Sequence, residues 1–316
     1  MKINEVKQIG IIGTGIIANG TAVLTTLYGY STTMLALTND LAKESQSRYD
    51  EVMDDFVARG VLSQERAEYC RGLLRYTIDY SDLANVDVIF EAVVEIPEVK
   101  RSVYSLIEEN CSDIKVICSM SSALEVDVLT QDATKYKDRI IVAHPFSPVY
   151  MVPYFELAKG TETDDKVLRF AKRLLETMDR KPVVLKKSIP GFIGNRLQFA
   201  LWREAMNIVE SGVADPEDVD TCLQYSFCPR YTSIGIFEHF DNCDLELCRK
   251  VSDFTFPTLA NTKEAPELLT NLLDAGKRGR PTGEGFYDWS NVNLKEFQER
   301  LLAPYWKFAK FMEIDK

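Results

Sequence analysis

The sequence is poor in the residues that mark metal-binding, disulfide-linked or membrane-spanning proteins. It has 2 histidines, and its 7 cysteines are scattered, odd in number and form no CxxC pair. This pattern indicates neither a disulfide framework nor a zinc site, so we expect buried free thiols and no bound metal. No segment approaches the roughly 20 apolar residues that a membrane-spanning helix needs. The first residues also lack the apolar core of a secretory signal, which predicts a cytoplasmic protein.

Positive charge is also scarce. The chain carries 37 Lys and Arg against 48 Asp and Glu, a net charge of -11. Nucleic acids and anionic membranes both require positive surface, so we expect neither as a partner. With 316 residues, the chain exceeds the usual ceiling of roughly 250 to 300 residues for one hydrophobic core. We therefore expect two domains.

Up to about residue 187, apolar runs alternate with segments of helical periodicity. This alternation is typical of a parallel sheet with helices on both faces. Segment 39–75 is longer than a normal crossover and predicts two helices, with Ser63 capping the second, in a hairpin that projects from the sheet. The predicted strands lie near residues 8–12, 33–37, 87–91, 115–118, 140–143, 153–157 and 182–185.

The strand pattern stops at the segment 186–191, which contains Pro190 and Gly191. We place the domain boundary here, with a dinucleotide-binding domain over 1–187 and a helical substrate and dimerisation domain over 188–316. The predicted fold is α/β: a Rossmann-type doubly wound sheet with a helical hairpin insertion, followed by an all-helical domain. Its predicted helices are one that ends at Gly212, one that begins after Asp215, and others over 244–260, 266–275 and 294–312.

A glycine turn follows the first predicted strand. Gly13 and Gly15 occupy the first two positions of a GxGxxG pattern, and Ala18 stands at the third. In such a turn the glycines allow the backbone to approach a pyrophosphate, which lies at the N-terminus of the next helix. We therefore expect a dinucleotide site at Gly13, Gly15, Ile17 and Ala18.

The second predicted strand lacks the acidic residue that usually binds the adenine ribose of NAD. Ala36 occupies that position, and the nearest polar residues are Thr38, Asn39 and Asp40. No arginine stands there to bind a 2′-phosphate. We therefore expect NAD as the cofactor, with NADP not excluded.

His144 ends an apolar run and begins a loop with Pro145. Ligands of doubly wound sheets bind at the carboxyl ends of the strands, and imidazole is the side chain that titrates near neutral pH. His144 is therefore a candidate acid/base group, although a histidine that ends a strand is often only structural.

Several segments, taken in order, resemble the 3-hydroxyacyl-CoA dehydrogenase family, including its branch of gulonate and carnitine dehydrogenases and lambda-crystallin. They cover nearly the whole chain. The segments are the glycine turn 13–18, residues 90–95 with Lys100, residues 119–124, His144 to Glu156, residues 190–197 and residues 283–289.

The resemblance implies a role for each candidate residue. His144 would be the general base, Glu156 would orient it, Ser122 would bond the reacting oxygen, and Asn195 would position the substrate. Glu156 lies in an apolar strand, where a carboxylate is costly unless it is paired, so we expect it to bond His144. Glu91, Glu95 and Lys100 would lie on the nicotinamide side of the cleft. Ser122 and Asn195 could instead be helix caps, and Lys100 an ordinary solvated lysine.

The implied function is NAD-dependent interconversion of an L-3-hydroxyacyl compound and its 3-oxo form, of the 3-hydroxybutyryl-CoA dehydrogenase type. This would place the chain in fatty acid metabolism as a homodimer joined through its helical domain. Two rivals remain: a dehydrogenase of a free 3-hydroxy acid, and a catalytically silent structural member.

The nature of the substrate is left open by three features. Pro145 resembles the gulonate and carnitine branch, and Ser147 stands where the family commonly has asparagine. In acyl-CoA members the hairpin helps to hold the coenzyme A tail. Its arginines at 59, 66, 71 and 75 could converge on a phosphate, although the hairpin as a whole is not basic.

Overall fold

The computed structural model describes residues 1–313, which form two compact units. The first unit comprises residues 1–193 and the C-terminal residues from 299 onward, and the second comprises 194–298. The chain thus divides six residues after the predicted boundary, and its C-terminal segment leaves the helical unit. Ala309 and Phe311 are buried in the core of the first unit, which explains why this segment belongs there.

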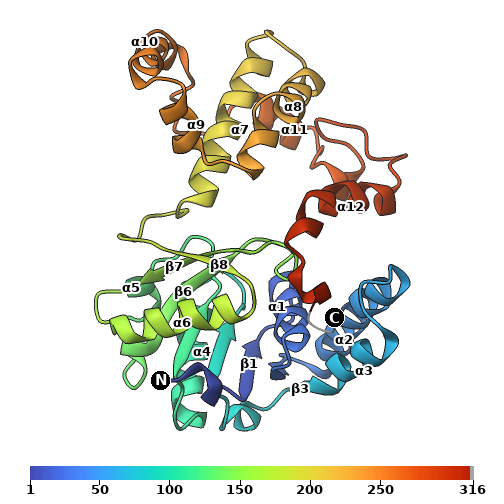
Figure 1. Cartoon of the computed structure of the whole chain (residues 1–316), viewed down its shortest axis with the longest axis vertical. Helices are drawn as coiled ribbons and strands as arrows, with labels where there is room; N and C mark the ends of the chain where they lie inside the picture. The colour runs from blue at the N-terminus through green and yellow to red at the C-terminus, as the bar shows by residue number, and fades with distance from the viewer. Residues whose placement is uncertain (314–316) are drawn as a thin grey trace. The chain divides into compact units, whose positions relative to one another are not determined.

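An eight-stranded sheet forms the centre of the first unit, in the order β3-β2-β1-β4-β5-β6-β7-β8 (Figure 1). Neighbouring strands are parallel except β6 and β7, which are antiparallel. The strands are β1 (Gln8–Ile12), β2 (Ser31–Leu35), β3 (Leu74–Thr77), β4 (Val88–Glu91), β5 (Val116–Ser119), β6 (Ile140–Pro145), β7 (Tyr154–Lys159) and β8 (Lys181–Val184).

Seven of these strands match predicted ones, and β3 is the one that the sequence analysis missed. It has four residues, lies at the edge of the sheet and begins directly after a helix, without a turn residue between them. β4, β5 and β8 are equally short, but β3 is only partly buried and Arg75 interrupts it, so no continuous apolar run marks it as a strand.

Helices cover both faces of the sheet (Figure 1). The predicted hairpin consists of α2 (Asn39–Ala58) and α3 (Gln64–Leu73), and Ser63 caps α3 by accepting a bond from the Arg66 amide at 3.0 Å. The other helices are α1 (Ile16–Leu27), α4 (Pro97–Asn110), α5 (Val126–Leu129) and α6 (Asp165–Thr177), with 3-10 turns at Ile3–Glu5, Tyr80–Leu83 and Lys137–Arg139.

Two apolar clusters lie on opposite faces of the sheet. In β4, Val88 and Phe90 belong to the cluster that contains α1 and α6, whereas Ile89 belongs to the cluster of α4 and α5. Successive side chains of a strand point to opposite faces, so a strand covered on both sides is apolar throughout. This explains why central strands such as β4 and β5 were visible in the sequence as apolar runs.

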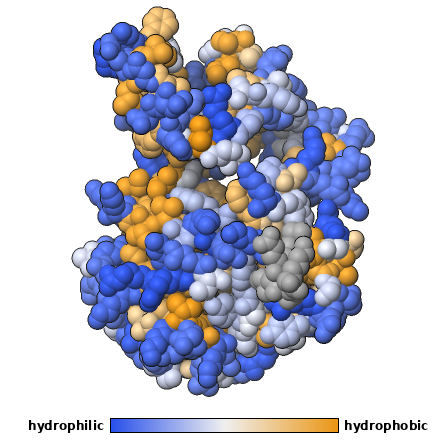
Figure 2. All heavy atoms as spheres, in the orientation of Figure 1, coloured by the Kyte–Doolittle hydropathy of each residue, from blue (hydrophilic) through white to orange (hydrophobic). Residues whose placement is uncertain are grey.

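The second unit is helical and has little core of its own. Among residues 194–298, Met206 is the only buried residue. Many large apolar side chains of this unit are exposed, including Phe237, Phe254 and Val213, and Figure 2 shows hydrophobic residues on the molecular surface. Its helices are α7 (Gly194–Glu210), α8 (Pro216–Tyr225), α9 (Ile236–Asn242), α10 (Leu245–Thr255), α11 (Glu267–Asp274) and α12 (Leu294–Leu302), with 3-10 turns at Cys228–Thr232, Phe256–Thr258 and Arg280–Thr282.

Two expectations for the C-terminal half need correction. Helix α9 was not predicted, and the helix expected over 294–312 ends at Leu302 because Pro304 cannot continue it. The chain goes on as 3-10 turns over Ala303–Phe308 and Lys310–Glu313. Among residues 1–313, no helix combines the length and apolarity needed to cross a bilayer.

The cysteines are free, but only some are buried as predicted. Cys70, Cys111 and Cys118 are buried in the first unit. The other four lie in the second unit, where Cys222 is exposed and Cys228, Cys243 and Cys248 are partly exposed. The prediction of buried thiols therefore fails in the unit that lacks a core.

Candidate active site

The antiparallel pairing of β6 with β7 places His144 directly opposite Glu156. The Nδ1 atom of His144 lies 2.9 Å from Oε2 of Glu156. Both residues are buried, with exposed fractions of 4% and 0%. The carboxylate that was expected to need a partner in its apolar strand therefore has one, and that partner is the expected imidazole.

Two further donors hold Glu156 in place. Its Oε1 accepts a hydrogen bond from the Ile193 amide at 2.8 Å and one from the Tyr154 hydroxyl at 3.1 Å. Burial, with a contribution from Glu156, raises the pKa of Tyr154, so this hydroxyl stays protonated and donates. Neither donor was predicted from the sequence. Tyr154 could have been found, because residues two apart on a strand share a face.

The Ile193 amide reaches Glu156 through a turn with unusual backbone angles. Gly191 has φ of 74° and Phe192 has φ of 48°, a left-handed conformation that is uncommon for a bulky residue. Phe192 is fully buried, and its ring centre lies 5.6 Å from that of His144. The ring of Phe146 lies 5.1 Å from the same imidazole. The turn therefore supplies both a donor for Glu156 and an apolar wall for His144.

Because Nδ1 of His144 faces Glu156, Nε2 is the ring nitrogen that can exchange a proton with a substrate. A carboxylate that faces Nδ1 favours the tautomer that carries its proton there, so the lone pair resides on Nε2. Such a nitrogen can accept a proton, and Glu156 would then stabilise the resulting cation. The pair is therefore suited to general acid/base catalysis.

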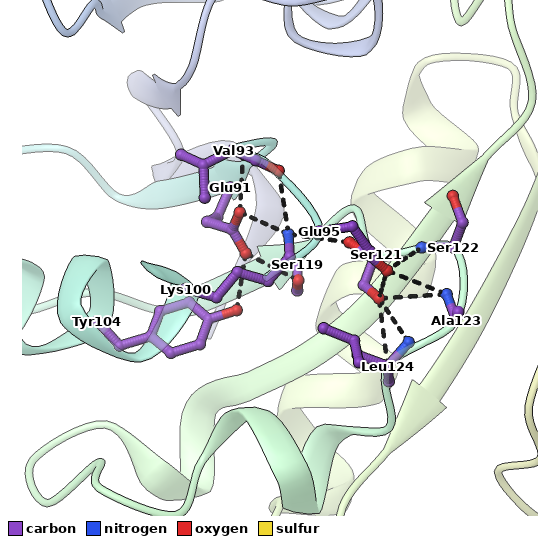
Figure 3. A network of polar contacts seen from close by, with 10 residues as sticks. All are labelled: Glu91, Val93, Glu95, Lys100, Tyr104, Ser119, Ser121, Ser122, Ala123 and Leu124. Atoms are coloured by element: carbon purple, nitrogen blue, oxygen red, sulfur yellow. Dashed lines mark hydrogen bonds and ion pairs between the residues drawn. The ribbon is translucent and has the colours of Figure 1, made fainter. Parts of the chain in front are cut away.

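Ser122 lies in the loop that follows β5, the strand next to β6. Glu95 fixes this loop, because its Oε1 accepts bonds from the amides of Ser122 at 3.0 Å and Ala123 at 3.1 Å and from the Ser121 hydroxyl. The side chain of Ser122 points away from Glu95 (Figure 3). Burial raises the pKa of Glu95, but the Ser121 hydroxyl, Lys100 and the Ala123 amide lower it more, so its net pKa falls.

Glu91 and Lys100 lie inside the first unit, so the alternative of a solvated lysine is wrong, and their role on the nicotinamide side stays a prediction. Their side chains are 0% and 1% exposed, and Lys100 Nζ lies 2.8 Å from Glu91 Oε1. The other oxygen of Glu91 accepts bonds from the hydroxyls of Tyr104 and Ser119, both at 2.8 Å (Figure 3). Lys100 Nζ also lies 3.4 Å from Glu95. Lys100 therefore lies between the buried Glu91 and Glu95, the residue that binds the Ser122 loop.

The glycine turn has the shape that a dinucleotide requires. Gly13 has φ of 115°, and a Cβ there would lie 2.7 Å from the carbonyl oxygen of Ala92. A Cβ on Gly15 would have no atom within 4 Å, so open space lies beside the N-terminus of α1. Gly15 caps α1 without a side-chain bond. Amide groups at the start of this helix are thus suited to a pyrophosphate, and the residues present fit NAD.

The remaining cofactor candidates lie on either side of this turn. Ala18 is fully buried, and Ile17 is partly buried against the core. Ala36 was expected within the second strand but directly follows β2, is buried, and donates its amide to the Thr77 carbonyl at 2.8 Å. The next side chain, Leu37, is 86% exposed. A carboxylate is therefore absent from both of these positions.

Asn195 is the second residue of α7 and thus belongs to the second unit. It follows Ile193, the donor to Glu156, by two residues along the chain. Its role with the substrate stays a prediction.

Comparison with known families gives two matches that together span most of the chain. Residues 8–188 match 3-hydroxyacyl-CoA dehydrogenase, NAD binding domain, and residues 191–289 match 3-hydroxyacyl-CoA dehydrogenase, C-terminal domain. The chain therefore belongs to the 3-hydroxyacyl-CoA dehydrogenase family, and its first unit contains the NAD-binding domain.

Three similar proteins illustrate the range within the family. L-carnitine dehydrogenase of Bacillus cereus is 30% identical over 74% of this chain and 71% of its own length. The 3-hydroxybutyryl-CoA dehydrogenase of Bradyrhizobium diazoefficiens is 27% identical over 90% of this chain and 96% of its own length. The solved structure of an NAD+-dependent 5-formyl-3-hydroxy-2-methylpyridine 4-carboxylic acid 5-dehydrogenase covers 98% of this chain and 99% of its own, with a TM-score of 0.87 and 26% identity.

Proposed function

We propose that this member of the family is an NAD-dependent dehydrogenase that interconverts an L-3-hydroxyacyl substrate and its 3-oxo form, with 3-hydroxybutyryl-CoA as the leading substrate. The observation that carries the proposal is the buried pair of His144 and Glu156, 2.9 Å apart, in the NAD-binding unit. Catalysis requires a proton acceptor of this kind, because the substrate hydroxyl must lose its proton when the carbon loses hydride.

Bound NAD would supply the hydride acceptor. The residues of the chain accept the proton and bind and orient the substrate. His144 takes the hydroxyl proton on Nε2, and Glu156 holds the ring and stabilises the imidazolium. Ser122 bonds the reacting oxygen, and Asn195 positions the substrate. Positioned general bases are typically worth about a hundred- to ten-thousandfold in rate.

The exposed apolar side chains of the second unit support a homodimer. Monomeric proteins rarely leave large contiguous apolar surfaces uncovered. Residues 194–298 bury only Met206 yet expose Phe237, Phe254, Phe256 and Leu245. A second copy of this chain would cover these side chains. We also propose that the enzyme is located in the cytoplasm and acts in fatty acid metabolism.

The direct test measures NADH oxidation with acetoacetyl-CoA. We expect turnover with the thioester that exceeds turnover with free acetoacetate, and His144→Gln should remove it. Turnover of neither compound by the wild-type enzyme would refute the proposed function.

A second candidate is a dehydrogenase of a free 3-hydroxy acid, and the hairpin favours it. Its four arginines bind groups of the protein itself: three pair with carboxylates, and Arg66 donates to the Leu27 carbonyl. Arg71 pairs with Asp50 at 3.0 Å, with Glu68 at 2.9 Å and also with Asp54. Arg59 pairs with Asp55 at 2.7 Å. Turnover of carnitine or another free acid with no preference for the thioester would establish this alternative.

A further inference from the structure

Arg180 is a buried cation that the reaction described above does not use. It stands between α6 and β8, directly after Asp179, and its exposed fraction is 1%. Burial lowers the pKa of its guanidinium. Removing a charge from water costs several kcal/mol unless hydrogen bonds replace the lost hydration. A cation in this place therefore needs strong partners.

Asp179 is one of these partners through its charge, and the others include backbone carbonyls, three of them in the loop that joins β6 to β7. Arg180 Nη1 donates to the carbonyl oxygens of Val149 at 3.2 Å, Tyr150 at 3.3 Å and Val152 at 3.5 Å, while Nε donates to Met178 at 2.8 Å. The loop, residues 146–152, begins two residues after His144 and ends shortly before Glu156. One guanidinium thus binds the segment that connects the two members of the pair.

The same loop packs against the helix that follows the glycine turn. Val149 is fully buried, and a Cβ placed on Gly20 of α1 would lie 3.2 Å from the Cβ of Val149. Only a glycine at position 20 allows this approach without a shift. The loop therefore lies between the strand that carries His144 and the helix that receives the cofactor phosphates.

We propose that Arg180 is a positioning residue, which holds the loop 146–152 against α1 and thereby sets the place of His144 relative to the bound cofactor. This inference rests on the proposed function. The alternative is that Arg180 stabilises the fold and nothing more. The two hypotheses differ in what they predict for a folded variant without the Arg180 guanidinium. A positioning role predicts that His144 is displaced, whereas a purely structural role predicts that His144 is unchanged.

The test compares Arg180→Met with Arg66→Met. Arg66 is a matched control, because its Nη2 donates to the Leu27 carbonyl at 2.7 Å, at the far end of α1 from the glycine turn. We expect both variants to unfold at a lower temperature. Arg180→Met should also lower kcat at least about tenfold, a loss typical of misplaced catalytic groups, whereas Arg66→Met should keep kcat within about twofold of the wild type.

A second readout does not depend on turnover. The chain has 2 histidines, so the NMR signals of the His144 imidazole can be assigned against those of His239 in the second unit. In Arg180→Met, we expect the hydrogen-bonded Nδ1 proton of His144 to shift or broaden while His239 stays unchanged. If the wild-type enzyme turns over no hydroxyacyl substrate, the proposed function fails, but this signal still decides the role of Arg180.

Arg180→Lys covers the case in which the methionine variant does not fold. Lysine keeps the charge but cannot reproduce the planar fork that bonds Met178 and the loop together. We expect it to change the His144 signal in the same direction and to retain part of the lost kcat. The proposal is overturned if the folded Arg180 variants leave both kcat and the His144 signal as in the wild type.

Discussion

The two units of this protein differ in the side chains that they bury and expose. The first unit buries charged side chains such as Glu91, Lys100 and Glu156, and each of these three is hydrogen-bonded to another side chain. The second unit buries only Met206 and leaves Phe237 90% exposed. A buried polar group is tolerated only where the surrounding structure provides its hydrogen-bond partners. Such groups therefore identify the first unit as the one whose side-chain positions are most narrowly fixed. The exposed apolar side chains of the second unit form the surface on which the proposed dimer depends.

The largest difference between the two units is expected for the loss of kcat when a histidine is replaced, His144 in the first unit or His239 in the second. His144→Gln should lower kcat by about a hundred- to ten-thousandfold, because the proton acceptor is lost. NADH binding, measured by fluorescence titration, should change little, because the glycine turn is untouched. His239→Gln, in the second unit, is the control and should keep its kcat. Wild-type activity in His144→Gln would refute the mechanism.

A charge on the apolar surface of the second unit should break the proposed dimer. Phe237→Asp places a carboxylate where the side chain is 90% exposed in one copy and would become buried between two. We expect the dimer to dissociate at least about tenfold more readily, as measured by sedimentation velocity. Lys172→Asp, on α6 of the first unit, should leave the assembly unchanged. A wild-type protein that sediments as a monomer would contradict the proposal.

A smaller effect, on cofactor affinity, is expected at Ala36, where the usual ribose-binding carboxylate is absent. Ala36→Asp should tighten NADH binding about two- to tenfold, the equivalent of one hydrogen bond to the adenine ribose. The same charge should weaken NADPH binding by repelling the 2′-phosphate. Ala36→Asn, the neutral control, should not repel NADPH. Titration of both cofactors checks this, and an equal change for both in Ala36→Asp would show that residue 36 does not face the ribose.

The smallest effect concerns stability. Burial raises the pKa of Glu108, but the amides of residues 134–136 and the Thr134 hydroxyl lower it more, so its net pKa lies below the usual 4.5. Its stabilisation is therefore fully present above about pH 4.5 and is lost as the pH falls through the lower, folded-state pKa.

Glu108→Gln should thus lower the free energy of unfolding by about 1 kcal/mol at pH 7. The difference from the wild type should shrink at pH 3.5, as measured by urea unfolding at both pH values. Glu246→Gln removes an exposed pair with Lys250 in the second unit and should have almost no effect at either pH. A difference for Glu108→Gln that is the same at both pH values would contradict the interpretation.

The contrast between the units also explains which sequence predictions were accurate. The six central strands of the first unit, β1, β2 and β4 to β7, are mostly buried on both faces, so they were predicted from the sequence, whereas the partly exposed edge strand β3 was not. The pairing of Glu156 with His144 followed from the cost of a lone buried carboxylate. Glu91 and Lys100 were assigned to the nicotinamide side, which stays a prediction, but their pairing with each other inside the unit was not predicted. No local pattern distinguishes a lysine that faces a ligand from one that faces a buried carboxylate.

Local chemistry in the chain suffices for the alternation of strands and helices, the cap at Ser63 and the glycine turn, because each depends on residues within a few positions of one another. The turn that brings the Ile193 amide to Glu156, the loop carbonyls that Arg180 binds, and the return of Phe311 to the first unit became visible only in three dimensions. These contacts join residues that are distant along the chain. Which of the many possible partners meet is settled by the packing of the whole sheet and its helices, not by any short stretch of sequence.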